Sequence, residues 1–180
     1  MGLLMVLYTQ STILYAQFEM VLFFRETHAI FGRSNPTIMH DTLLLLHSYL
    51  RYFILIALLI VIVKSLLGWL NNKPFTAIDN KFGLYLLIFT HMQLLVGLIL
   101  YFTSNVVQFT SETMKVKMLR YWTVEHITAM LIAIVLITAA RITSKKMPTD
   151  LAKHKRLAIF NIIALIIIIG SLALSDRRII

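Results

Sequence analysis

The last long apolar stretch of the chain, residues 157–175, reads LAIFNIIALIIIIGSLALS and contains no charged side chain. A helix that crosses a bilayer needs roughly 20 mainly apolar residues, and this stretch is long enough. Three stretches of similar character lie upstream of it, after position 40. The sequence therefore predicts four membrane-spanning helices, at residues 42–70, 82–103, 121–140 and 157–174.

The composition of the whole chain agrees with a lipid environment. Of its 180 residues, 59% are hydrophobic and 14% are charged, and the mean hydropathy is +0.82. The absence of cysteine excludes disulfides, iron–sulfur clusters and cysteine nucleophiles. The formal charge of +9 does not indicate nucleic-acid binding, because the basic residues lie between apolar runs and not on one soluble segment. We therefore expect an all-α integral membrane protein whose basic side chains meet lipid headgroups.

Short polar connections follow the first and third apolar stretches, at residues 71–74 and 147–150. Helices joined by short loops pack as antiparallel neighbours, which predicts an up-down four-helix transmembrane bundle. The longer connection, residues 104–120, has room for a short interfacial helix. Loops one and three carry eight basic residues, Arg141 and Lys145 among them, and the opposite face carries five. The positive-inside rule then predicts that loops one and three are cytoplasmic.

The first 38 residues are a separate problem. They are apolar enough to span a membrane, but they contain Gln10, Gln17 and Glu19 and no basic residue before Arg25. A secretory signal would need a basic start, and an extra N-terminal hydrophobic helix would need a partner for Glu19. A further interpretation is that translation starts at Met39, from which the chain runs directly into the first apolar stretch. We therefore separate an N-terminal hydrophobic extension, residues 1–38, from a four-helix transmembrane domain, residues 39–180.

Ionisable side chains inside the apolar stretches are the first functional candidates, because they are costly in lipid. His47 and His126 each lie about five residues from the predicted outer end of their helix, so their depths match. Two neutral imidazoles at one level on facing helices are what a six-coordinate b-type haem requires. Arg51 follows His47 by one helical turn, where a guanidinium can pair with a haem propionate. These residues predict haem b with His47 and His126 as its iron ligands.

Other interpretations of the same side chains stay open. His47 and His126 are also suited to hydrogen bonds between helices. Arg51 is equally suited to an ion pair with Glu125, because both belong to the outer third of their helices.

The remaining histidines differ in depth. His91 lies near the middle of the membrane, roughly 10 Å deeper than the proposed ligands. It is placed to ligate a second haem, line a quinone pocket, relay protons or bond a neighbouring helix, with Asn161 at a similar depth. His28, His40 and His154 fall in predicted loops or at interfaces, where a histidine carries little information.

Three functions are compatible with this pattern. No nucleotide-binding loop, nucleophile elbow, zinc-protease motif or carboxylate dyad occurs in the sequence, so a stand-alone enzyme is not indicated. The first hypothesis is a b-type cytochrome-like electron carrier, with His91 as an alternative ligand or quinone-side group. The second is a haem-free accessory or scaffold subunit of a membrane complex. The third is a small proton or solute transporter built on His91, Glu125 and His126.

Four segments of the chain resemble a small bacterial family of four-helix membrane proteins that is labelled cytochrome b or cytochrome b-like. They are LLLLHSYLRYFILI (43–56), GLYLLIFTHMQLLVGLILYF (83–102), MKVKMLRYWTVEHITAMLIAIVLI (114–137) and AKHKRLAIFNIIALIIII (152–169). The resemblance covers about residue 39 to the C-terminus, and its matching positions are His47, Arg51, His91, Gln93, Glu125, His126 and His154. It implies haem b, electron transfer and a multi-pass position in a bacterial inner membrane. The partners expected are the lipid bilayer and a quinone or a larger redox complex.

Overall fold

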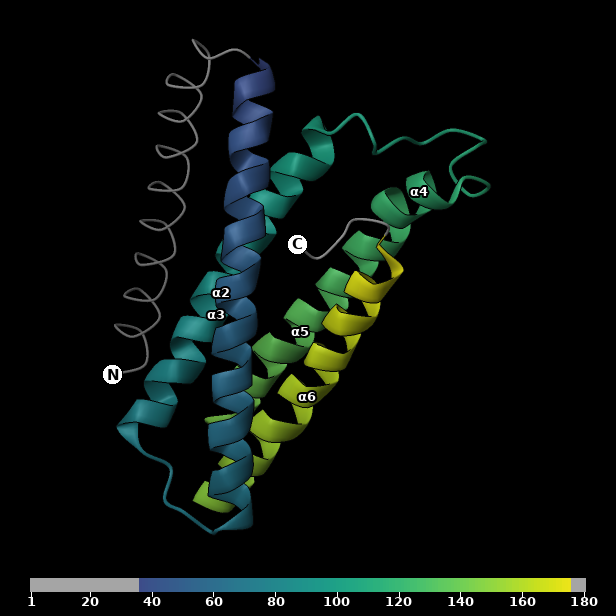
Figure 1. Ribbon diagram of the computed structural model, residues 1–180. Helices are drawn as coiled ribbons and strands as arrows, with labels where there is room; N and C mark the ends of the chain where they lie inside the picture. The colour runs from purple at the N-terminus through teal and green to yellow at the C-terminus, as the bar shows by residue number, and fades with distance from the viewer. Residues whose placement is uncertain (1–35, 176–180) are drawn as a thin grey trace, which may run out of the picture. The chain divides into compact units, whose positions relative to one another are not determined.

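The computed structural model describes residues 36–175, which form helices and contain no β-strand. The chain divides into two units, residues 1–42 and 43–180, and the fold below is that of the second. Its helices are α2 (Pro36–Leu70), α3 (Ala77–Thr103), α5 (His126–Ser144) and α6 (Asp150–Leu174), with the short α4 (Lys117–Arg120) and η1 (Tyr121–Glu125) leading into α5 (Figure 1). The predicted all-α four-helix bundle is confirmed. Most of the predicted N-terminal extension, residues 1–35, lies outside the described residues.

Four helices of the described part are long and apolar enough to cross a membrane. They are Thr37–Leu70, Ala77–Thr103, Lys117–Ser144 and Asp150–Leu174. Large apolar side chains are exposed on every one of these helices, for example Ile56, Leu84, Val135 and Ile166. Acyl chains are the solvent that such surfaces match. The chain is therefore a multi-pass membrane protein whose outer faces contact the bilayer.

The helix α2 ends in a left-handed turn. Asn72 has a φ of 51°, a conformation that asparagine adopts more readily than most residues. The N–H of Lys73 donates to the carbonyl of Gly68 at 3.0 Å, which is the hydrogen bond of a Schellman cap. This turn ends the first span where the polar residues 71–74 predicted.

All four spans begin earlier than hydropathy predicted. Those that contain α3 and α6 do so with polar, capped first turns. The hydroxyl of Thr76 accepts from the N–H of Asp79, whose carboxylate accepts from the N–H of Thr76, so that α3 begins with a capping box. The hydroxyl of Thr149 accepts from the N–H of Ala152 at the start of α6. The helix α5 likewise continues to Ser144, beyond the predicted end at 140.

The centre of the bundle is apolar. Leu58 of α2, Leu86 of α3, Ile137 of α5 and Ala164 of α6 are buried there. The helices α5 and α6 pack closely along their length, α3 meets α5, and α2 approaches the others through side chains. Most of the buried polar groups lie toward the two ends of the bundle, whereas Thr90 and Asn161 lie near the middle of α3 and α6.

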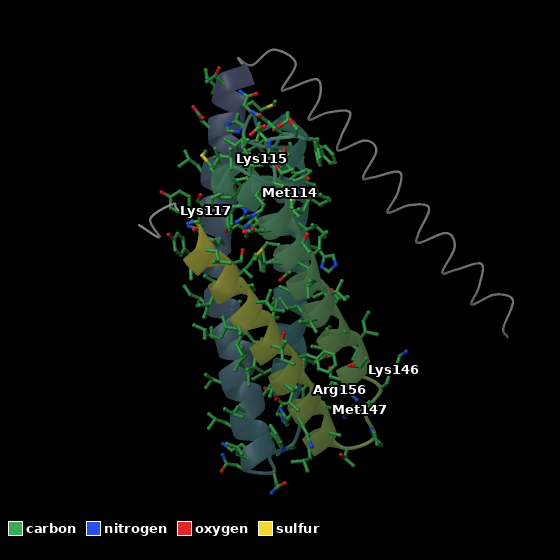
Figure 2. The ribbon with its side chains drawn as sticks, turned by 90° about the vertical axis from the view of Figure 1, so that its right-hand side faces the viewer. Met114, Lys115, Lys117, Lys146, Met147 and Arg156 are labelled. Carbon is green, nitrogen blue, oxygen red and sulfur yellow. The ribbon has the colours of Figure 1, made fainter. Side chains whose placement is uncertain are left out.

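We call the end that carries residues 71–76 and 145–149 the basic end. Figure 2 shows Lys146, Met147 and Arg156 together there, and Lys115 and Lys117 at the opposite end. The opposite end carries the connection 104–116, which consists of turns. The short helix predicted within residues 104–120 is thus limited to α4, the last turn before η1.

Candidate functional site

His47 is fixed against α3 by two neighbouring positions of that helix. The side-chain Nε2 of Gln93 donates to the backbone carbonyl of His47 at 3.0 Å. One turn later stands Gly97, where an added Cβ would lie 3.1 Å from Cε1 and 3.6 Å from Nδ1 of the His47 ring. The ring therefore lies close to the backbone of α3. Its buried Nδ1 has no hydrogen-bond partner.

His126 is the first residue of α5, and its ring is held by Tyr121. The Tyr121 hydroxyl donates to the carbonyl of Ser171 on α6 at 2.9 Å, and its oxygen lies 3.4 Å from Nδ1 of His126. A hydroxyl has one proton, so a hydroxyl that donates to Ser171 can only accept from His126. This arrangement favours the tautomer with the imidazole proton on Nδ1 and, on Nε2, the lone pair that a metal requires.

The turn before His126 is a π-helix, Tyr121–Glu125. The N–H of His126 bonds to the carbonyl of Tyr121, five residues earlier. The Tyr101 hydroxyl of α3 donates to the carbonyl of Thr123 at 2.8 Å, and the Thr123 hydroxyl accepts from the N–H of Gln108 at 3.1 Å. Such insertions into a helix occur often at functional sites. Here the inserted turn is tied to α3 and to the connection 104–116, so the position of His126 is rigid.

His126 lies within electrostatic range of the His47 side chain. Arg51 also interacts with His47 electrostatically, while its guanidinium donates to the Tyr52 hydroxyl at 3.0 Å and lies over that ring. The ion pair considered between Arg51 and Glu125 does not form. Glu125 pairs instead with Arg120, Nε to Oε1, at 2.7 Å, because the two residues face each other across the π-helical turn.

His91 makes none of the contacts described above for His47 and His126. Its side chain is exposed, and its Nδ1 lies 2.8 Å from the carbonyl of Leu87 in the same helix. Asn161, considered as its partner, is 1% exposed, and its Oδ1 has no hydrogen-bond partner. No hydrogen bond recorded for residues 36–175 joins these two side chains.

Two basic residues that were assigned to loop three lie inside helices and are buried. Arg141 is 4% exposed in α5, and His154 is 2% exposed in α6. The His154 ring packs on Gly68, where an added Cβ would lie 2.5 Å from Cε1. Hydropathy misplaced them because the polar first and last turns of α5 and α6 look like loop sequence. Gly68 lies against the His154 ring and Gly97 against the His47 ring. Neither glycine carried a distinguishing signal in the sequence.

The chemical capacity of this site follows from its ligands. Within residues 36–175 there is no group of three or more His, Cys, Asp or Glu side chains that could hold a bare metal ion. A haem supplies its own equatorial nitrogens and needs only two axial residues. His47 and His126 are described residues that could supply these two positions. In comparisons with family models, with curated proteins and with solved structures, nothing matches this chain.

Proposed function

We propose that this chain is a membrane-embedded b-type cytochrome-like protein that takes part in electron transfer. His47 of α2 and His126 of α5 would hold the iron of one haem b, in the half of the bundle farther from the basic end. The observation that carries the proposal is the contact of Nδ1 of His126 with the Tyr121 hydroxyl, which donates to Ser171 and so favours a proton on Nδ1. A histidine so oriented presents Nε2 as a ligand.

The residues around His47 fit such a group. Gly97 leaves no side chain between α3 and the imidazole, and a Cβ at this position would crowd the ring. The orphaned Nδ1 of His47 shows that the ring's hydrogen-bonding capacity is not used up by the protein. A buried polar atom without a partner is costly and points to a group that the chain alone does not supply.

Bound haem would supply one-electron chemistry, and the protein would hold and tune it. Tyr121 would orient one ligand, and Gln93 would fix the helix that carries the other. Arg51 lies within electrostatic reach of His47 and would pair with a propionate. The exposed apolar helices support a position of the protein in a bilayer. We propose a bacterial inner membrane as the setting, and a quinone or a larger redox complex as the partner.

The proposal is tested by a reduced-minus-oxidised absorption spectrum of the purified chain. We expect b-type bands that disappear in His47→Ala and in His126→Ala. His91→Gln is the matched control, because it also removes an imidazole, but one that is exposed and bonded to its own helix. A folded, colourless protein that takes up no added haem would contradict the proposal, and so would bands that depend on His91 alone.

A haem-free scaffold subunit is the second candidate, and the hydrogen bonds between helices favour it. Gln93 joins α3 to α2, Tyr101 joins α3 to η1, and Tyr121 joins η1 to α6. In lipid, such bonds contribute to helix association. In that case, replacing Gln93 or Tyr101 should lower the stability of the colourless protein without any spectral consequence.

A further inference from the structure

An open pocket of about 300 Å³ lies at the basic end, away from the histidine pair. Its walls come from the start of α3, the C-terminal end of α5 and the first turn of α6. The lining residues are Phe75, Thr76, Ala77, Asn80, Lys145 and Lys153. The volume is at the lower end of the range for small-molecule sites. Two of these six residues, Lys145 and Lys153, carry an ammonium group, which favours an anionic ligand.

A third cation lies one helical turn deeper along the same seam. Arg141 precedes Lys145 by four residues on α5, and Gly83 follows Asn80 by three on α3, so each pair shares a helix face. A Cβ at Gly83 would lie 3.3 Å from Cδ and 3.7 Å from Nε of Arg141. The Arg141 side chain therefore lies between α3 and α5, beneath the pocket.

The positive charge of Arg141 has no counter-charge among the described residues. Its Nε and Nη1 are buried without a hydrogen-bond partner. Each carboxylate of residues 36–175 is within 4 Å of another basic group, in the pairs Asp41–His40, Asp79–Lys64, Glu112–Lys115, Glu125–Arg120 and Asp150–Lys153. A guanidinium does not lose its proton in a protein, and a buried unpaired charge is strongly destabilising. An anion from outside this part of the chain would therefore stabilise the buried guanidinium of Arg141.

We propose that this pocket binds a phosphate-bearing anion, with Lys145 and Lys153 at its mouth and Arg141 beneath it. Lys153 already pairs with Asp150 at 2.8 Å, so the net charge of the site is close to +2. A phosphate group offers several acceptor oxygens and matches the fork of a guanidinium. The position at the ends of the spans matches the depth of phospholipid headgroups, and basic pockets between transmembrane helices bind anionic lipids. The inference is independent of haem.

The test uses the full chain in nanodiscs of phosphatidylcholine with or without phosphatidylglycerol. Native mass spectrometry counts the phosphatidylglycerol that stays on the protein after release from the disc. The double variant Lys145→Gln/Lys153→Gln changes one exposed and one half-buried position and keeps the buried Arg141. We therefore expect this variant to fold. The matched control is Lys155→Gln/Arg156→Gln, which removes the same charge from the same end but from outside the pocket lining.

We expect the wild type and the control to retain phosphatidylglycerol, and the pocket variant to bind it about tenfold more weakly. Arg141→Gln should weaken retention at least as much. A second arm titrates inorganic phosphate against the detergent-solubilised chain and follows the thermal midpoint. A rise that the pocket variant lacks, without lipid retention, would assign the site to soluble phosphate. Equal lipid retention in both double variants, with no effect of phosphate, would overturn the proposal.

Discussion

Replacing Tyr121 with phenylalanine removes a single oxygen atom from the centre of the candidate site. The ring is 3% exposed and packs edge-on against Trp122, with 4.8 Å between the ring centroids. Phenylalanine keeps that contact but loses the hydrogen bonds to Ser171 and to His126. A buried polar group left without its partner costs about 1–3 kcal/mol, so we expect a loss of stability in this range with or without haem.

The same substitution should also weaken haem binding, by a free energy similar to the loss of stability. Without the Tyr121 oxygen, Nδ1 of His126 loses the hydrogen bond that favours a proton on it. Removing the group that orients a metal-ligating histidine typically lowers metal affinity by about 10- to 100-fold. Titration of the haem-free chain with haem, followed at the absorption band of the bound form, measures this directly. Thermal unfolding in the same detergent measures the stability term separately.

Tyr85→Phe is the matched control for this experiment. Tyr85 is also on a membrane-spanning helix, but it is 52% exposed, so loss of its hydroxyl should leave both haem affinity and stability unchanged. The reasoning is refuted if Tyr121→Phe is destabilised but binds haem as tightly as the wild type. Tyr121 would then be a helix-bridging residue only, and the tautomer of His126 would be fixed by something else.

Two further predictions concern glycines at close helix contacts. Gly97→Ala should weaken haem binding, because its Cβ would lie 3.1 Å from Cε1 of His47. The control is Gly170→Ala, whose Cβ would have nothing within 4 Å and which should stabilise α6 by up to about 1 kcal/mol. Gly68→Ala should destabilise the wild type by about 1–3 kcal/mol, because its Cβ would lie 2.5 Å from the His154 ring. In a His154→Ala background the same change should be neutral or stabilising. Strictly additive effects in that double-mutant cycle, measured by thermal unfolding, would exclude the contact.

The sequence was sufficient to predict the fold because the bilayer imposes it. Four apolar stretches of spanning length with short polar connections leave few alternatives to an up-down bundle. The ends of the helices were predicted less well, because hydropathy does not register a capped polar turn. The capping box of Thr76 and Asp79 starts α3 five residues before its predicted start at 82, and Thr149 starts α6 well before 157. The same error placed Arg141 and His154 in a loop.

The sequence predicted depths for the candidate residues but not their contacts. Counting residues from the helix ends matched His47 with His126, since rise per residue is nearly constant in a helix. The rotation of each helix about its axis is decided by packing, which no residue count reveals. Sequence position alone therefore gave no reason to prefer Arg120 over Arg51 as the partner of Glu125. For the same reason, the exposure of His91 and the bond from Tyr121 to Ser171 emerge only in the folded chain.

Three glycines mark where polar side chains cross between helices. Gly68 of α2 faces His154, Gly83 of α3 faces Arg141, and Gly97 of α3 faces His47. Glycine inside a helix costs roughly 1 kcal/mol relative to alanine, and in each case it lets a bulky polar group lie against a neighbouring backbone. Two of these crossings are near the basic end and one is in the opposite half, with the apolar centre between them. Because that centre contains no ionisable group among its buried members, no chain of titratable groups links the two ends of the bundle. The proposed haem and the proposed phosphate should therefore bind independently of each other, so that the pocket variants leave the haem spectrum unchanged.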